Sequence, residues 1–105
     1  MTDRLLSPDV LRELLVHDGS ADGLATAQGV LGRVGGTEVG LWEVEPGTDT
    51  DVEVDEVFLV LSGLGKVSFA DGGAIDLRPG VLVRLHAGDQ TTWTITERLR
   101  KLYLA

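Results

Sequence analysis

The feature that most constrains the fold of this chain is a series of short β-type runs that fills the sequence from Leu24 onward. Turn-forming residues separate most of the runs; Asp71-Gly72-Gly73 is the clearest hairpin turn, and Ser62-Gly63 is another turn signal. The runs cover residues 24–28, 30–34, 38–45, 57–61, 66–70, 74–77, 81–85, 91–96 and 98–104. Short strands at this spacing predict an all-β barrel or double-sheet roll rather than βαβ units.

The segment ahead of these runs predicts one short helix. Ser7 is suited to the N-cap and Pro8 to the first helical position, and apolar residues then recur at helical spacing as far as His17-Asp18-Gly19. These apolar residues are Val10, Leu11, Leu14 and Leu15. We therefore expect residues 1–23 to form an N-terminal helix and linker, and residues 24–105 to form one β-domain.

Composition narrows the classes of partner. The 105 residues, 43% of them hydrophobic, suffice for one domain with one core. The formal charge of -8, from 9 basic and 17 acidic residues, has the wrong sign for nucleic acid or an anionic membrane surface. Without cysteine there are no disulfides or thiolate metal sites. We expect a cytoplasmic location, because the sequence contains neither a signal-peptide pattern nor a run near the ~20 apolar residues of a membrane span.

Two segments carry glycines and one acid at characteristic spacings. Within residues 47–63, Glu56 is followed by six residues and then by Gly63. Within residues 80–94, Gly80 is followed by five residues, then by His86-Ala87-Gly88, and Thr91 stands after two more. These segments resemble the two sequence motifs of the cupin superfamily.

Further elements resemble one branch of that superfamily, the cupin-3 or DUF861 group, which includes ureidoglycine aminohydrolase cupin domains and ethanolamine-utilisation Q-type proteins. The resemblance covers about residues 36 to 105 and implies a small jelly-roll barrel of the RmlC-like type, a site in the barrel mouth, a ureido or amino compound as ligand, and a homodimer. Its elements are Gly40-Leu41-Trp42-Glu43, Pro46-Gly47, Asp55-Glu56, Arg78-Pro79-Gly80, Thr92-Trp93 and Arg100-Lys101-Leu102-Tyr103-Leu104.

The resemblance implies a metal site of three histidines and one glutamate, and of these four ligands only the glutamate, Glu56, is present. The positions ahead of Glu56 where the first motif has two histidines fall within residues 49–52, which are Asp, Thr, Asp and Val, and Thr91 stands in place of the histidine of the second motif. Zinc, iron and copper sites usually need imidazole or thiolate ligands. We therefore expect no resident cofactor; Glu56, Asp49 and Asp51 are only weak candidates for holding a hard divalent ion.

Strand alternation suggests which side chains line a cavity. Glu56 and Phe58 share one face of a strand, and Thr91 and Trp93 share a face of another. Glu56 is then a candidate general acid or base, with Phe58, Thr91, Trp93 and Trp42 as candidate ligand-binding residues. Two alternatives stay open. Glu56 could accept hydrogen bonds from neighbouring backbone amides, or pair with Arg84 or Lys66, and so only order the barrel mouth. The tryptophans could be core residues.

An acidic run precedes Glu56. Asp49, Asp51, Glu53 and Asp55 alternate with Thr or Val, so these acids share one face of an extended segment. We expect that face to point to solvent, where it would protect a sheet edge; the alternative is that the carboxylates gather a cation.

Three functional hypotheses follow. The first is a cupin-domain protein that binds a small polar molecule in the barrel cavity without a histidine-based metal centre. The second is an enzyme of ureido or amino-compound metabolism that uses Glu56 as acid or base, with or without a weakly bound divalent ion. The third is a non-catalytic, dimeric accessory or scaffold module. Because a fold does not determine a function, residues must decide among them.

Overall fold

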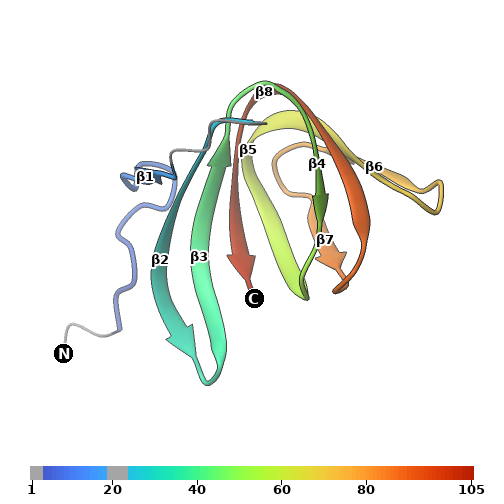
Figure 1. Ribbon diagram of the computed structural model, residues 1–105. Helices are drawn as coiled ribbons and strands as arrows, with labels where there is room; N and C mark the ends of the chain where they lie inside the picture. The colour runs from blue at the N-terminus through green and yellow to red at the C-terminus, as the bar shows by residue number, and fades with distance from the viewer. Residues whose placement is uncertain (1–3, 19–23) are drawn as a thin grey trace.

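The computed structural model describes residues 4–18 and 24–105, and every regular element in them is a β-strand (Figure 1). None of the described segments is a helix long and apolar enough to cross a membrane. The strands are β1 (Val16–His17), β2 (Thr26–Val34), β3 (Thr37–Val44), β4 (Gly47–Val52), β5 (Glu56–Phe69), β6 (Ala74–Leu77), β7 (Leu82–Leu85) and β8 (Gln90–Leu104).

All eight strands belong to one antiparallel sheet, which β5 and β8 divide into two halves. In the first half, the end of β8 pairs with β3 and with the start of β5, which also pairs with β7. In the second half, the start of β8 pairs with β4 and with the end of β5, which also pairs with β6. Figure 1 shows both long strands arching from one half to the other.

The bend in β5 falls at Gly63. The register against β8 shifts between Val60 and Ser62 and again on each side of Leu64. Gly63 has a φ of 93°, and a Cβ atom on it would lie 2.1 Å from the carbonyl oxygen of Arg98. Only glycine fits this position. The turn predicted at Ser62-Gly63 is therefore wrong: it is a bulged bend inside one continuous strand.

The core lies between the two halves. Val44, Phe58 and Leu99 come from the first half, and Val67 and Ile95 come from the second; all belong to one cluster of buried side chains. The path of neighbouring strands ends at β1 on one side and at β6 on the other. The all-β prediction is confirmed, but the described strands form an open roll rather than the closed barrel expected from the resemblance.

The predicted N-terminal helix is wrong where the chain is described. A single turn closes between Asp9 and Arg12, and Val16–His17 pairs with β2 as a strand. The segment lies against the outer face of the sheet, where the Arg100 guanidinium donates to the carbonyl oxygen of Val10 at 2.8 Å. In a helix that carbonyl would accept from an amide four residues later, so this tertiary contact competes with a helix too short to be stable alone. Residues 19–23 of the predicted linker lie outside the described residues.

Gly40 offers a direct test of how β3 packs against β8. It lies opposite Tyr103, whose Cζ and Oη would both be 2.4 Å from a Cβ atom at position 40. We expect Gly40→Ala to lower the free energy of unfolding by about 1–3 kcal/mol, because the tyrosine ring would have to move. Urea unfolding measures this. Gly36→Ala is the matched control, since nothing lies within 4 Å of its Cβ position; equal effects of the two variants would contradict the packing.

Candidate functional site

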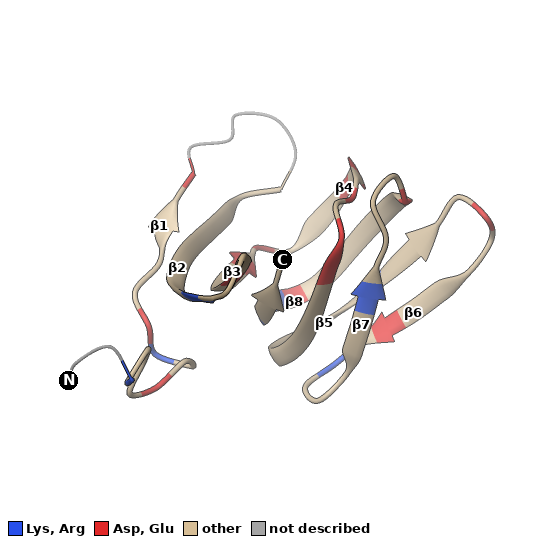
Figure 2. Cartoon of the chain, turned by 90° about the horizontal axis from the view of Figure 1, so that it is seen from below, with Lys and Arg blue, Asp and Glu red and all other residues tan. Residues whose placement is uncertain are grey.

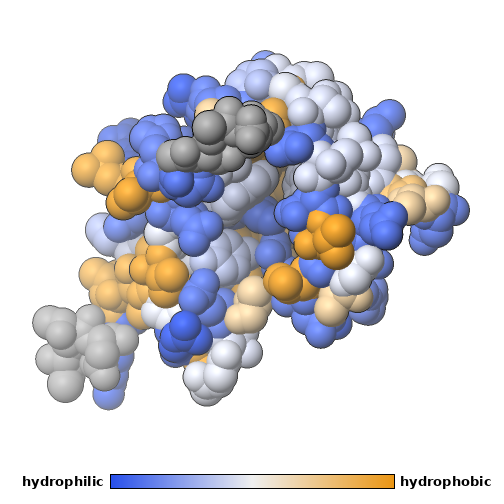
Figure 3. All heavy atoms as spheres, in the orientation of Figure 1, coloured by the Kyte–Doolittle hydropathy of each residue, from blue (hydrophilic) through white to orange (hydrophobic). Residues whose placement is uncertain are grey.

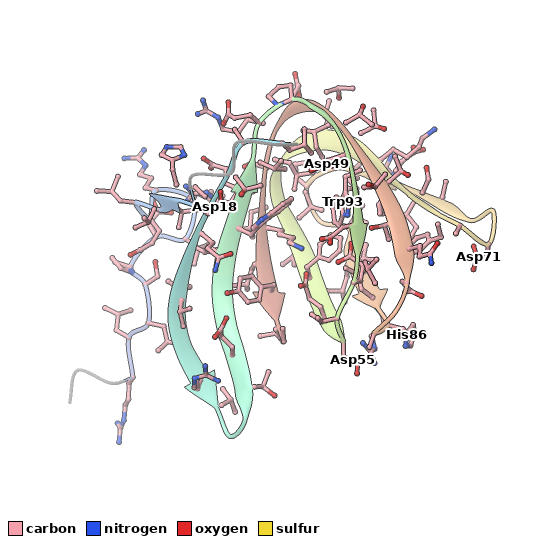
Figure 4. All side chains as sticks on the ribbon, in the orientation of Figure 1. Asp18, Asp49, Asp55, Asp71, His86 and Trp93 are labelled. Atoms are coloured by element: carbon pink, nitrogen blue, oxygen red, sulfur yellow. The ribbon has the colours of Figure 1, made fainter. Side chains whose placement is uncertain are left out.

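Alternation along three neighbouring strands brings the candidate site together on the inner face of the first half of the sheet. Lys101 of β8 lies opposite Trp42 of β3 and opposite Val60 of β5. Glu56 and Phe58 are on the same face of β5 as Val60, because successive side chains alternate between faces. Trp93, from the start of β8, reaches this group from the second half of the sheet (Figure 4).

A cavity of about 600 Å³ opens beside this group. Trp42, Trp93 and Tyr103 form aromatic parts of its wall. Lys101 is the only basic side chain that lines it in the described part of the chain. The carboxylates that line it are Asp18, Glu38, Asp49, Asp51, Glu53 and Glu56. Acidic segments are visible on β4 and at the start of β5 (Figure 2), so the cavity has a strongly acidic lining.

Glu56 and Lys101 form a buried ion pair. The Lys101 Nζ donates to Glu56 Oε2 at 2.6 Å, and the two side chains are 7% and 12% exposed. Neither Arg84 nor Lys66 is the partner. Arg84 pairs with Asp55, and Lys66 lies exposed in the other half of the sheet. Glu56 therefore pairs with a cation, but the cation is Lys101 rather than Arg84 or Lys66.

Aromatic rings surround the ammonium of Lys101. The Nζ atom lies 4.4 Å from the ring centroid of Phe58, 4.7 Å from that of Trp42 and 5.0 Å from that of Trp93. A cation within about 6 Å of a ring face is attracted by the ring quadrupole. The rings also contact one another, with the Trp93 centroid 5.6 Å from Trp42 and 5.5 Å from Phe58. Lys101 is therefore held by three rings and one carboxylate.

A second carboxylate, Glu53, is buried with neutral partners. Its Oε2 accepts from the Thr91 hydroxyl at 2.6 Å and from the Trp93 indole N–H at 2.9 Å, and the residue is only 9% exposed. Trp93 therefore contacts Lys101 with its ring face and Glu53 with its indole N–H. This burial corrects the expectation that the whole acidic run faces solvent: Asp51 and Asp55 are exposed, whereas Glu53 turns inward.

Tyr103 carries a third internal polar contact. Its hydroxyl donates to Glu38 Oε2 at 2.7 Å. Burial, and after it the hydrogen bond to Glu38 and the negative charge of that carboxylate, raise the pKa of Tyr103 to about 12. The phenol therefore stays protonated in the folded protein and can act only as a hydrogen-bond donor or acceptor near neutral pH.

The other predicted site residues are placed as follows. Asp49 and Asp51 lie on β4 at the cavity wall; Asp49 accepts from the backbone N–H of Leu24 at 3.2 Å. Phe58 is fully buried beneath Lys101 and does not line the cavity. Thr91 is buried, and its hydroxyl donates to the carboxylate of Glu53. Figure 4 shows Asp49 on the same side of the molecule as Trp93.

The loop near Asp55 and His86 is a separate polar cluster at the rim (Figure 4). Asp55 accepts from the Ala87 backbone N–H at 3.1 Å and from Arg84 at 3.2 Å. These two hydrogen bonds hold the pKa of Asp55 below its usual range. His86 is exposed. Neither residue lines the cavity, so the rim cluster orders the loop.

Two residues of the site, Lys101 and Glu53, were not predicted. For Lys101 a signal existed, because it alternates with the apolar Leu99 and Tyr103 and must share their inner face. For Glu53 no local signal existed, because its neighbours at alternate positions are the exposed Asp51 and Asp55.

The side chains present do not fit the metal that the cupin resemblance implies. Among residues 4–18 and 24–105, no group of three or more His, Asp or Glu side chains is arranged to hold a metal ion. Glu56, the motif glutamate, is already bonded to an ammonium group. Thr91, at the position of the second-motif histidine, directs its hydroxyl to Glu53.

The hydrogen bond from Thr91 to Glu53 predicts that Thr91→Val destabilises the folded protein. Valine matches threonine in shape but cannot donate to the buried carboxylate, so we expect the free energy of unfolding to fall by about 1–3 kcal/mol. Thr94→Val on the same strand is the matched control, because Thr94 is exposed, and should change it by less than about 0.5 kcal/mol. If both variants unfold at the same urea concentration, Thr91 does not support Glu53.

The raised pKa of Tyr103 predicts that its phenol titrates only at high pH. It is the only tyrosine, so the absorbance of tyrosinate reports on it alone, and the midpoint in the folded protein should lie near pH 12. In the unfolded chain the pKa is about 10, so this contribution to stability is complete below pH ~10 and is lost between about 10 and about 12. Glu38→Gln should lower the folded midpoint without restoring it fully, because burial remains. A wild-type midpoint near pH ~10 would contradict the buried contact.

Comparisons with known proteins agree with the fold. A protein of unknown function from Rhizobium leguminosarum bv. viciae 3841 is 28% identical, with 80% of this chain and 82% of that one aligned at a TM-score of 0.68. A DUF861 family protein from Thermotoga maritima is 28% identical over 60% of this chain and 73% of that one, with a TM-score of 0.57. The EutQ protein of Clostridium difficile shares the fold at 18% identity, covering 77% and 67%, with a TM-score of 0.65.

Sequence comparison assigns the chain to a family. No curated protein matches the chain. The family model described as "EutQ-like cupin domain" matches residues 31–103, which is most of the sequence and includes both motif segments. The resemblance to the cupin-3 group is thereby confirmed, and the chain belongs to the EutQ-like cupin domain family.

Proposed function

We propose that this chain binds a small polar molecule in the cavity beside Trp42, Trp93 and Lys101, without a resident transition metal. The observation that carries the proposal is the cavity itself, whose volume of about 600 Å³ is within the usual range for small-molecule sites. Its wall combines the faces of Trp42 and Trp93 with many polar groups, six of them carboxylates. The wall is thus more polar than that of most small-molecule sites, which favours a polar ligand.

The charges around the cavity favour a ligand without net negative charge. Lys101, the one basic side chain among the lining residues that the structure describes, is already paired with Glu56. Glu38 also pairs with Arg33, at 3.0 Å, but Arg33 does not line the cavity. Carboxylates therefore outnumber basic side chains in the described lining. An anionic ligand would be repelled, whereas a neutral amide or urea, or an organic ammonium, could donate hydrogen bonds to Asp51 or Glu53.

The two alternative functions remain predictions with weaker support. Glu56 as an acid or base would have to break its ion pair with Lys101 to take up a proton. A purely accessory module needs no cavity, and one is present. The homodimer also remains a prediction. Exposed apolar side chains on β1 and β2, such as Val16 and Val30, would support it, and apolar surface is visible on that side in Figure 3.

Three compounds of similar size test the ligand class: n-butylammonium, butyramide and butyrate. The chain has two tryptophans, Trp42 and Trp93, and both line the cavity, so their indole N–H signals in ¹⁵N NMR report on occupancy. We expect the ammonium and the amide to shift both signals saturably and butyrate to leave them unchanged. Preferential binding of butyrate, or no response to any of the three, would reject the proposal.

A pair of charge variants locates the binding. Asp51→Asn removes a carboxylate from the cavity wall and should weaken n-butylammonium binding by about twofold to fivefold, the effect of one partly screened charge, while leaving butyramide binding unchanged. Asp76→Asn is the matched control, because Asp76 is exposed on β6 and outside this cavity. Equal weakening by both variants would indicate a general charge effect rather than binding in this cavity.

A further inference from the structure

The buried ammonium of Lys101 has a position that the proposed function does not explain. Lys101 is 6% exposed and donates to Glu56, the glutamate that the family resemblance implies as a metal ligand. We infer that the Lys101 ammonium is a built-in cation that takes the place of the metal ion at this glutamate. The protein thus retains a cation-centred site while supplying the cation from its own chain.

The groups around Lys101 suit an ammonium rather than a metal ion. Phe58, Trp42 and Trp93 present ring faces within 4.4–5.0 Å of Nζ. Ring faces attract a monovalent organic cation but supply no nitrogen or oxygen lone pair to a transition metal. Glu56 accepts a hydrogen bond from Nζ, so the negative charge of the carboxylate balances the positive charge of the ammonium.

The remaining donors do not offer an alternative metal site. The Thr91 hydroxyl is bonded to Glu53 and lies 3.2 Å from the Trp93 indole nitrogen. Asp49 accepts from the Leu24 backbone N–H. A divalent ion on Glu56 would also lie next to the Lys101 ammonium, where like charges repel strongly in a partly desolvated site.

The sheet fixes Lys101 in this position. It lies in the middle of the first half of the sheet, with Trp42 opposite it on one neighbouring strand and Val60 on the other. Its side chain cannot leave the inner face without a change in strand register. Unlike a metal ion, this cation cannot be lost to a chelator.

Chemical rescue tests the inference directly. Lys101→Ala removes the side-chain atoms that n-propylammonium replaces. We expect the variant to melt roughly 10 °C or more below wild type, because Glu56 loses its buried partner. Millimolar n-propylammonium should raise the melting temperature of the variant saturably, whereas 1-propanol, a neutral molecule of similar shape, should not. Lys66→Ala, at the only other lysine, changes an exposed residue and should melt at the wild-type temperature. n-Propylammonium should raise the melting temperature of Lys101→Ala by more than that of wild type or Lys66→Ala, which measures any stabilisation by binding in the cavity alone.

A measurement on the wild-type chain keeps the inference testable if Lys101→Ala does not fold. With two lysines in the chain, ¹⁵N NMR should show one slowly exchanging ammonium signal from Lys101 beside the fast-exchanging signal of exposed Lys66. Adding EDTA, or one equivalent of Ni²⁺, should leave the Lys101 ammonium and the Trp93 indole signals unchanged.

Three results would overturn the inference. The first is stoichiometric Ni²⁺ binding that broadens the Trp93 and Lys101 signals. The second is a Lys101 ammonium that exchanges as fast as that of Lys66. The third is a folded Lys101→Ala variant with the melting temperature of wild type. None of these measurements depends on a cavity ligand, so failure here is distinguishable from failure of the proposed function.

Discussion

The site depends on β5 and β8 being continuous strands that each serve both halves of the sheet. Because β8 bends, Trp93 near its start meets Lys101 near its end, although the two residues are on different halves. Because β5 bends at Gly63, the start of that strand can place Glu56 and Phe58 on the same inner surface. A straight two-strand ribbon would put these side chains far apart, so the backbone bend at one glycine is a precondition of the cavity.

The interior contains two carboxylates with different partners. Glu56 is matched by a full positive charge, whereas Glu53 is held by a hydroxyl and an indole N–H. Pairs of this kind contribute little net stability compared with apolar side chains of equal size, but removing one partner is costly. Their retention in a chain of 105 residues therefore favours a role in shaping the cavity over a role in stabilising the fold. Trp93 joins the two carboxylates, so they are expected to respond together to a bound molecule.

Local patterns predicted most of the strands but missed β1 and β4, and they gave no prediction of strand pairing. Alternation grouped Glu56 with Phe58, and the structure has both on the inner side. The same patterns divided β2, β5 and β8 into shorter pieces, because the bulges within β2 and β5 and the bend in β8 resemble turns when only neighbouring residues are considered. The helix predicted to begin at Ser7-Pro8 does not form, because Arg100, ninety positions away from Val10, donates to the backbone carbonyl of Val10. The Glu56–Lys101 pair likewise depends on long-range register, which no local window contains.

Two adjacent basic residues of β8, Arg100 and Lys101, lie on opposite faces of the sheet. Arg100 pairs with Glu43 on the outer face at 2.8 Å, and Lys101 pairs with Glu56 on the inner face at 2.6 Å. A slip of β8 by one position would exchange the faces of Arg100 and Lys101 and leave both glutamates facing the wrong cation or none. The two ion pairs together favour the observed register of β8 over its near neighbours, because only this register forms both. A slipped register would leave two pairs of charges separated in a weakly polar environment, which is costly.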